Sequence, residues 1–293
     1  MSYDLYLKQR SGELSKLDFL QFFAHRQNFN VGNAQAGYGN DETGVYFGFE
    51  MRDPDPDDTE EFYPIAFNIN YFRPSYFILE AEPEVSAFVE QFDLVVLDPQ
   101  MHGMGEGEYS SSALISGWKY GNEFGYEAVL RDPNNRNNLS SLPSAELTRL
   151  WRWNYFRCEL QIEVGDSMFV PRIMLVQIDG GSRTVAAWPD GIPVVLPYVD
   201  YVVIGRDEFA PRKWLRRQKD HIFVSWNELH PNISNYDART NPNAVTLNYA
   251  SVPHDLREYV SHLPPNSLEV VGLSPDSVLD RELVEKYAVN GST

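Results

Sequence analysis

A run of acidic residues between positions 53 and 61 is the densest group of chemically capable side chains in the sequence. It alternates in part with prolines and consists of Asp53, Asp55, Asp57, Asp58, Glu60 and Glu61. Such carboxylates could bind calcium, but an EF-hand loop needs glycine at its sixth position and glutamate at its twelfth, where this chain has Asp58 and Pro64. Because Pro54 and Pro56 favour an extended backbone, two interpretations stay open. The run is either a solvated hairpin tip or a row of carboxylates that docks on a basic surface.

The remaining sequence motifs do not assemble a recognisable cofactor or catalytic site. The glycine-rich stretch 103–108 follows a predicted strand, but a dinucleotide loop would need a third glycine where Glu108 stands, and Glu106 and Glu108 would repel a pyrophosphate. The sequence contains no P-loop, zinc-protease helix or Gly-x-Ser-x-Gly elbow, and its six histidines lack close metal-ligand spacing. A Ser-His-Asp site would meet only in the fold, and nothing in the sequence nominates one. We therefore predict no cofactor, no metal and no catalytic residue.

The single cysteine, Cys158, excludes an intramolecular disulfide and a Cys-based zinc site. Residues 157–164 alternate strictly between polar and apolar side chains, which predicts a strand with Cys158 on its apolar face. We interpret Cys158 as a small core side chain, since apolar burial disfavours the reactive thiolate.

The formal charge of −18 is unevenly distributed along the 293 residues. Residues 1–109 hold 20 acids and 6 bases, a net of −14, whereas residues 110–293 hold 22 acids and 18 bases, a net of −4. A field of this sign repels nucleic acid and attracts basic partners. The start of the chain lacks a basic stretch followed by an apolar run, and no window approaches the length of a membrane helix. We expect a cytoplasmic protein that binds neither nucleic acid nor membrane.

The first 109 residues are predicted to form an α+β domain. The patterns indicate a strand at 3–8, a helix capped at Ser15 and ending near Arg26, strands at 29–38, 44–51, 62–71 and 76–80, a helix opened by Pro83, and a buried strand at 93–97. This order suggests a ferredoxin-like sheet with an extra hairpin. Three acids near the second helix complete the predicted partner-binding set, namely Glu80, Glu82 and Glu84.

Residues 110–293 are predicted to form a second, larger α+β domain. Strands at 157–164, 169–178, 183–188 and 193–204 suggest a β meander, with flanking helices near 254–262 and 278–288 and a long polar loop at 227–243. A basic block, 212–219, is predicted to be a short helix opened by Pro211. It is interpreted as a docking face toward the acidic domain, a solvated helix, or, less favoured, a nucleic-acid contact.

Two stretches carry a family resemblance. Residues 2–7, Ser-Tyr-Asp-Leu-Tyr-Leu, and residues 187–202, which include Ala187-Trp188-Pro189-Asp190-Gly191, resemble bacterial immunity proteins of type VI and contact-dependent secretion toxin systems. The resemblance covers about a third of the chain and carries no chemistry. It implies a cognate toxin that is bound tightly and held inactive.

Charge and resemblance together predict a non-catalytic immunity protein. Its partner would be a toxin with a basic substrate surface, for which a cytosol-acting nuclease is the obvious class, and the acidic face of residues 1–109 would occlude that surface. The alternative is an enzyme or small-molecule-binding protein with a pocket between the two domains. A scaffold of the same secretion apparatus is a third possibility, and the oligomeric state is left open.

Overall fold

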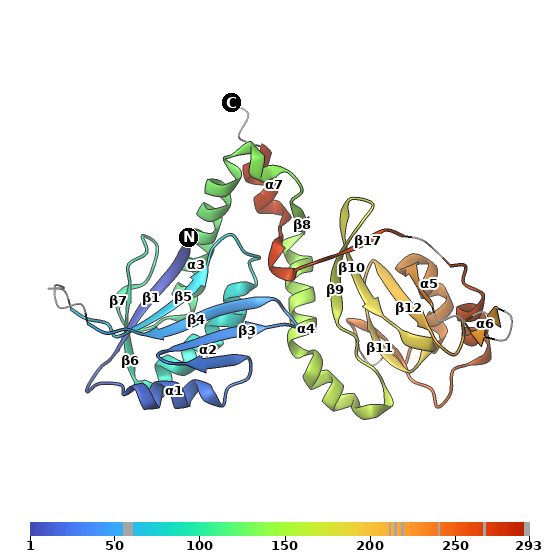
Figure 1. Ribbon diagram of the computed structural model, residues 1–293, viewed down its shortest axis with the longest axis horizontal. Helices are drawn as coiled ribbons and strands as arrows, with labels where there is room; N and C mark the ends of the chain where they lie inside the picture. Colours follow the sequence, from blue (N-terminus) through green and yellow to red (C-terminus); the bar gives the residue numbers. More distant parts are fainter. Residues whose placement is uncertain are drawn as a thin grey trace. The chain divides into compact units, whose positions relative to one another are not determined.

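The computed structural model describes residues 1–54, 61–210, 212–213, 216–217, 220–239, 241–265 and 268–289. The chain divides into two compact units, each mixed in helix and strand. Unit 1 comprises Met1–Thr148 and Pro275–Thr293, and unit 2 comprises Arg149–Ser274. A boundary at position 109 therefore falls inside unit 1, because the helix that follows it packs on other elements of that unit. The two units are drawn in sequence colours in Figure 1.

Unit 1 is built on a seven-stranded sheet in the order β2-β3-β4-β5-β1-β6-β7, with every neighbouring pair antiparallel. Its strands are β1 (Ser2–Gln9), β2 (Phe29–Gly32), β3 (Gln35–Asn40), β4 (Val45–Met51), β5 (Ile65–Asn70), β6 (Leu94–Asp98) and β7 (Gly105–Gly107). A large antiparallel sheet in the N-terminal region is thus present as predicted. The ferredoxin-like designation stays a prediction.

Two helices cover one face of this sheet, α1 (Lys16–Ala24) and α2 (Phe77–Phe92). Ser15 caps α1 by accepting the backbone N–H of Asp18 at 3.1 Å, as its sequence pattern predicts. Phe23 of α1 and Phe88 of α2 both pack on Phe49 of β4, so both helices lie on the same side of the sheet. The aromatic core between them accounts for the alternating burial of the strands.

The helix α2 begins earlier than its sequence suggested. Residues 76–80 were predicted as a strand and Pro83 as the first helical position, but the helix starts at Phe77 and Pro83 lies inside it. A proline in a helix interior costs about 3 kcal/mol. The buried side chains of Phe77, Ile78 and Ala81 continue the apolar face of the helix upstream, and their burial offsets that cost.

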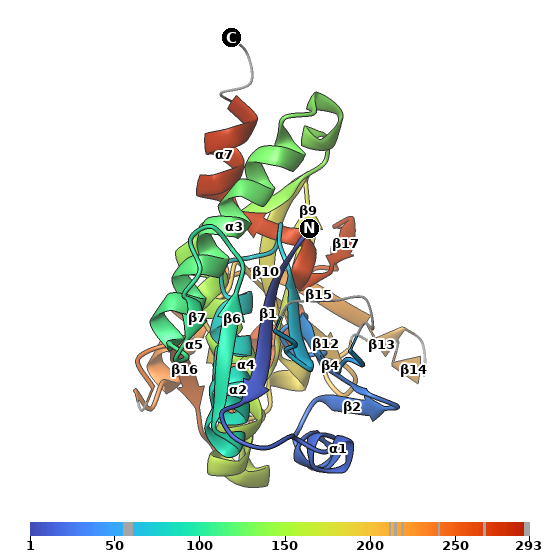
Figure 2. The ribbon, with the colours of Figure 1, turned by 90° about the vertical axis from the view of Figure 1, so that its left-hand side faces the viewer.

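The remaining elements of unit 1 bring the C-terminal segment back to the N-terminal domain. They are α3 (Ser111–Leu130), β8 (Ser140–Leu142), the first residues of α4 (Ser144–Val164), β18 (Val278–Asp280) and α7 (Arg281–Val289). The strand β18 pairs parallel with β8, and α3 lies beside α7 (Figures 1 and 2). The buried carboxylate of Asp280 accepts the backbone N–H of Ser75 at 2.8 Å and the hydroxyl of Tyr126 at 3.2 Å. These contacts explain why 275–293 belongs to unit 1.

Glu282, at the start of α7, makes the stability of unit 1 depend on pH. Its carboxylate accepts the Ser144 hydroxyl at 2.6 Å and backbone N–H at 3.0 Å, and the hydroxyl bond is the main cause that lowers the pKa of Glu282. A lowered carboxyl pKa contributes stability above the unfolded pKa of about 4.3, and this contribution is lost as the pH falls through the folded pKa.

We therefore expect Glu282→Gln to lower the stability at pH 7, and the difference from wild type to shrink at acid pH. Urea unfolding at pH 7 and at about pH 3, below the carboxyl pKa range, measures both. Glu285→Gln, an exposed change on the same helix, is the control. A difference for Glu282→Gln that stays constant with pH would contradict the prediction.

Unit 2 contains a five-stranded sheet in the order β15-β12-β10-β9-β17, in which β10 and β12 are parallel and the other neighbours antiparallel. The strands of this sheet are β9 (Ile173–Ile178), β10 (Gly181–Ala187), β12 (Tyr201–Arg206), β15 (Asp220–Ser225) and β17 (Val270–Leu273). A separate pair joins β11 (Val194–Pro197) to β16 (Ala244–Leu247), and the helices are the rest of α4, α5 (Trp226–Ile233) and α6 (His254–His262). Further sheets in the second half are thus confirmed, although the parallel pair departs from a simple meander.

Three sequence predictions for this region are wrong. Residues 157–164 belong to the helix α4, where Leu160 and Val164, four residues apart, pack against a small apolar cluster. Residues 227–233, predicted as part of the loop 227–243, belong to α5 (Trp226–Ile233), which begins with a capping box between Ser225 and Glu228. Within the basic block, 212–213 and 216–217 form short antiparallel strands, β13 and β14, in place of a helix.

Candidate functional site

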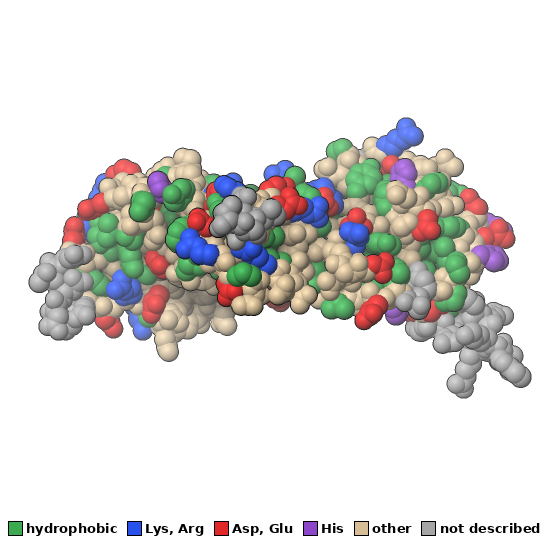
Figure 3. Space-filling model, turned by 90° about the horizontal axis from the view of Figure 1, so that it is seen from above, with side chains coloured by type: hydrophobic (Ala, Val, Ile, Leu, Met, Phe, Trp, Pro, Cys, Tyr) green, Lys and Arg blue, Asp and Glu red, His purple; other side chains and the backbone are tan. Residues whose placement is uncertain are grey.

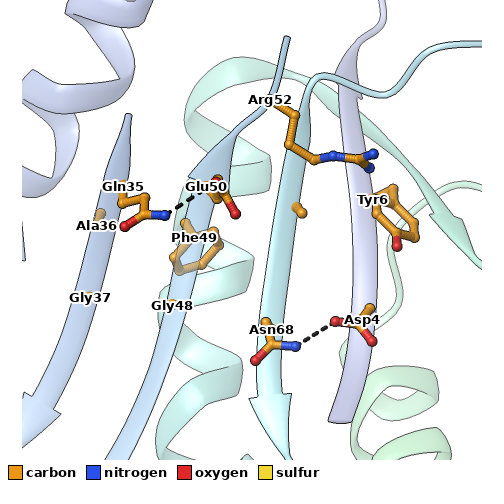
Figure 4. Close-up of a pocket in the computed structure, with 11 residues that line it drawn as sticks. Asp4, Tyr6, Gln35, Ala36, Gly37, Gly48, Phe49, Glu50, Arg52 and Asn68 are labelled. Carbon is orange, nitrogen blue, oxygen red and sulfur yellow. Dashed lines mark hydrogen bonds between the residues drawn. The ribbon is translucent and has the colours of Figure 1, made fainter. Parts of the chain in front are cut away.

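The exposed face of the unit 1 sheet carries a pocket of about 430 Å³. It lies opposite the face that α1 and α2 cover, because its side chains alternate with the buried ones along each strand. Figure 4 shows four strands contributing to it, β3, β4, β5 and β1. Its lining is Asp4, Tyr6, Gln35, Ala36, Gly37, Gly48, Phe49, Glu50, Arg52, Ala66 and Asn68.

Two carboxylates stand at separate walls of this pocket, each held by a neutral amide. Glu50 accepts the side-chain amide of Gln35 at 3.2 Å, and Asp4 accepts that of Asn68 (Figure 4). The Asp4 carboxylate also accepts a hydrogen bond from the Ser2 hydroxyl at 3.1 Å. Neutral donors orient a carboxylate without cancelling its charge, so both walls keep their negative charge.

Arg52 supplies the positive group of the pocket. Its guanidinium lies 5.2 Å from the centre of the Tyr6 ring, a cation–π contact. It forms no ion pair with any residue of the described ranges. The pocket therefore holds two carboxylates and one guanidinium, and its excess charge is negative.

The acidic run begins and ends beside this face, at the connection between β4 and β5. Asp53 and Glu61 are both exposed, and Glu61 is paired with Lys8 of β1. Asp55, Asp57, Asp58 and Glu60, which were predicted to bind a partner, lie outside the described residues. The structure thus brings the two ends of the run to the strands that line the pocket, since Arg52 directly precedes Asp53.

The three predicted partner-binding acids of α2 have other roles. Glu80 is 1% exposed and accepts hydrogen bonds from Tyr38, Asn40 and Thr43, so its assignment to a docking surface is wrong. Because residue 80 lies on the core face of a helix that starts at Phe77, its side chain points inward. The other two are half-buried: Glu82 accepts the Tyr109 hydroxyl at 3.0 Å, and Glu84 pairs with Arg26 at 2.7 Å.

Cys158 is exposed on the helix α4, so its predicted burial on a strand is wrong. The stretch 103–108 contains β7 and adds an edge strand to the unit 1 sheet. Asp98, at the end of β6, accepts backbone N–H groups of Gln100 and Met104 and a bond from the Tyr3 hydroxyl, and burial followed by this bond raises the pKa of Tyr3. The stretch therefore has a structural role.

The Trp-Pro-Asp-Gly stretch of the resemblance is also structural. Trp188 is fully buried and donates its ring N–H to the carbonyl of Ile192 at 2.8 Å. The Asp190 carboxylate accepts the backbone N–H groups of three consecutive residues, 207–209. One aspartate thereby holds the end of β12 against the turn that follows Trp188.

A second pocket, of about 590 Å³, lies within unit 1 among α3, α4 and α7. Its two carboxylates are already engaged: Glu123 accepts hydrogen bonds from Lys286 and Tyr287, and Glu282 accepts those of Ser144. We interpret this pocket as a gap between the packed helices α3, α4 and α7, with a structural role only.

Within the described ranges, no three His, Cys, Asp or Glu side chains are arranged to hold a metal ion. The same ranges contain no helix with both the length and the apolar character needed to cross a membrane. The side chains of the basic block 212–219 lie outside the described residues.

The pocket residues on β1, β3, β4 and β5 were not singled out by the sequence. Period-two alternation along residues 2–9 and 45–51 was the available signal, because it separates an outward polar set from the buried set. Which strands would lie side by side was not readable from that alternation. No protein-family model, no curated protein and no solved structure matches this chain.

Proposed function

We propose that this protein is an immunity protein that binds a basic toxin through unit 1 and occludes the toxin's substrate surface. The observation that carries the proposal is the distribution of charge between the two units. Unit 1 contains 28 acids and 11 bases, a net of −17, and unit 2 contains 14 acids and 13 bases, a net of −1. Nearly all of the chain's charge of −18 thus belongs to one folded unit.

The exposed sheet face gives this charge a surface on which a partner could dock. It presents Asp4 and Glu50 on the strands and Asp53 and Glu61 beside them, while the helices occupy the opposite face. Figure 3, which views the molecule from above Figure 1, shows carboxylates dispersed among basic, hydrophobic and other side chains on the visible face. Opposite charge would speed association with a basic toxin and disfavour other partners.

A nuclease is the toxin class that we propose, because its active surface must be basic to hold phosphates. Carboxylates of unit 1 would then occupy positions that phosphates take in the substrate complex. This step rests on the charge and on the family resemblance of residues 2–7 and 187–202.

The test is complex formation with the toxin encoded by the neighbouring gene, purified as an inactive variant. We expect neutralisation of the acidic run to amides to weaken binding about 100-fold and to reduce its salt dependence. The run variant changes Asp53, Asp55, Asp57, Asp58, Glu60 and Glu61. The matched control neutralises six exposed acids of unit 2, namely Glu159, Glu163, Asp166, Asp179, Glu258 and Glu269. Absence of a complex, or equal weakening by both variants, would overturn the proposal.

A further inference from the structure

Gly37 and Gly48 line the floor of the sheet pocket, and packing within the protein does not require glycine at either position. Gly37 and Gly48 are directly paired on β3 and β4, and neither has a positive φ. A Cβ built on Gly37 would lie 4.0 Å from its nearest neighbour, and one on Gly48 would lie 3.7 Å from a carbonyl oxygen of Ala36. A side chain would fit at both positions. Gly121 differs, because its Cβ would lie 2.2 Å from the Tyr71 hydroxyl.

Strand glycines weaken a sheet, and they occur where a ligand or another backbone approaches closely. Since packing does not require Gly37 and Gly48, their effect is to keep the pocket floor low. Ala66 continues this floor onto β5, directly opposite Glu50 in the register. The part of this floor formed by Gly48 and Ala66 lies between Glu50 on β4 and Asp4 on β1.

The carboxylates of Asp4 and Glu50 determine which kind of side chain could bind in this part of the pocket. Asp4 stands on β1 and Glu50 on β4, with β5 between them, so the two strands are about 10 Å apart. A side chain that contacts both carboxylates needs hydrogen-bond donors on opposite edges. The planar guanidinium of arginine has five donors in a fixed fork, whereas the lysine ammonium is a compact point charge.

We propose that this pocket receives an arginine side chain of the partner protein, with its guanidinium over Gly48 and Ala66 and its N–H groups directed at Asp4 and Glu50. The inference rests on the proposed function for the identity of the partner. Arg52 stays on the Tyr6 ring.

The first experiment titrates the full chain with N-acetyl-arginine methylamide and follows backbone amide NMR signals of the pocket. We expect saturable shifts at Gly37, Gly48 and Asn68, an affinity about threefold higher than for the lysine analogue, and no shifts with the glutamate analogue. The double variant Asp4→Asn, Glu50→Gln should weaken arginine binding about tenfold. Shifts that are absent, or equal for all three probes, would overturn the inference.

The second experiment fills the floor without disturbing the fold. Gly48→Val introduces a residue that strands favour, so thermal stability should be unchanged or raised while arginine binding is lost. Gly39→Val is the matched control, since Gly39 lies on the same exposed face of β3, has no neighbour within 4 Å of a Cβ, and does not line the pocket. Arginine binding by Gly48→Val at wild-type affinity would contradict the inference.

Failure of this inference and failure of the proposed function give different results. If Gly48→Val binds the neighbouring toxin as tightly as wild type while the acidic-run variant does not, the pocket is not used and the proposed function stands. If wild type does not bind that toxin, the proposed function fails, and the titration with the arginine probe still decides the chemistry of the pocket.

Discussion

Replacement of Arg206 by methionine is expected to destabilise unit 2 by about 3 kcal/mol, given about 1 to 3 kcal/mol for each buried acceptor that loses its donor. Arg206 is fully buried at the end of β12. Its Nε and Nη2 donate to the two carboxylate oxygens of Asp220 at 2.8 and 2.7 Å. Its Nη1 donates to the carbonyls of Val260, Ser261 and Leu263 at 2.9, 3.2 and 3.0 Å.

The size of this effect follows from the groups that lose hydrogen bonds when the Arg206 guanidinium is removed. The three carbonyls belong to the last turn of α6 and the residue after it, where helical partners are missing and the helix dipole favours a cation. Methionine fills a similar volume but donates nothing, so these carbonyls lose their Arg206 donor and Asp220 loses its bidentate bond with the guanidinium. Lysine keeps the charge but cannot reproduce the planar fork, and we expect Arg206→Lys to lose most of the stability as well.

Hydrogen exchange and thermal unfolding would measure the loss. Peptides from 149–274 should lose protection while those from 1–148 keep it, because Asp220 and α6 both belong to unit 2. Arg183→Met is the control, since Arg183 is exposed on the neighbouring strand β10 and donates a hydrogen bond to the carbonyl of Ser182 beside it. Equal stability of Arg206→Met and Arg183→Met would show that the buried network contributes little.

Replacement of Glu80 by alanine is expected to destabilise unit 1 by about 3 kcal/mol, given about 1 to 3 kcal/mol for each buried donor left without a partner. One carboxylate oxygen of Glu80 accepts Tyr38 at 2.8 Å, Asn40 at 2.7 Å and Thr43 at 3.0 Å. These donors come from β3 and the turn that follows it, so Glu80 ties that hairpin to α2. The side chain lies in the first turn of α2, where the helix dipole favours a carboxylate.

Chemical denaturation of three variants separates the contribution of the Glu80 acceptor oxygen from that of its charge. Glu80→Gln keeps an acceptor oxygen, so it should lose less than half of what Glu80→Ala loses. Glu90→Ala, an exposed change on the same helix, should have little effect. If alanine and glutamine at position 80 proved equally costly, the charge of Glu80 and not its acceptor role would be the source of stability.

Local chemistry in the sequence was sufficient for several elements. The Ser15 cap with Phe19 and Phe23 on one face specifies α1, because a capping side chain and an apolar stripe act within a few residues. The strands β1, β4 and β5 were predicted from their alternation, and α6 was predicted at its observed position. The concentration of acids in the first 109 residues needs no structure at all.

Other features depended on contacts between distant segments. Alternation over 157–164 fits a strand, yet packing of Leu160 and Val164 keeps that segment in α4. Pro83 argued for a helix start, yet burial of Phe77 and Ile78 extends α2 past it. Propensity is a weak prior that tertiary burial overrides, and in both cases burial places a segment predicted as strand inside a helix.

The sequence by itself determined that the protein is strongly acidic, mixed in helix and strand, and without a recognisable catalytic motif. Only the tertiary structure decided that residues 110–148 and 275–293 belong to unit 1, which raises the contrast in net charge to −17 against −1. The same holds for Glu80, which is buried, and for Asp4 and Glu50, which face one pocket. The physical reason is that net charge is a sum over residues and periodicity is read within a short segment. Burial, and which side chains face one pocket, depend instead on which distant strands pair.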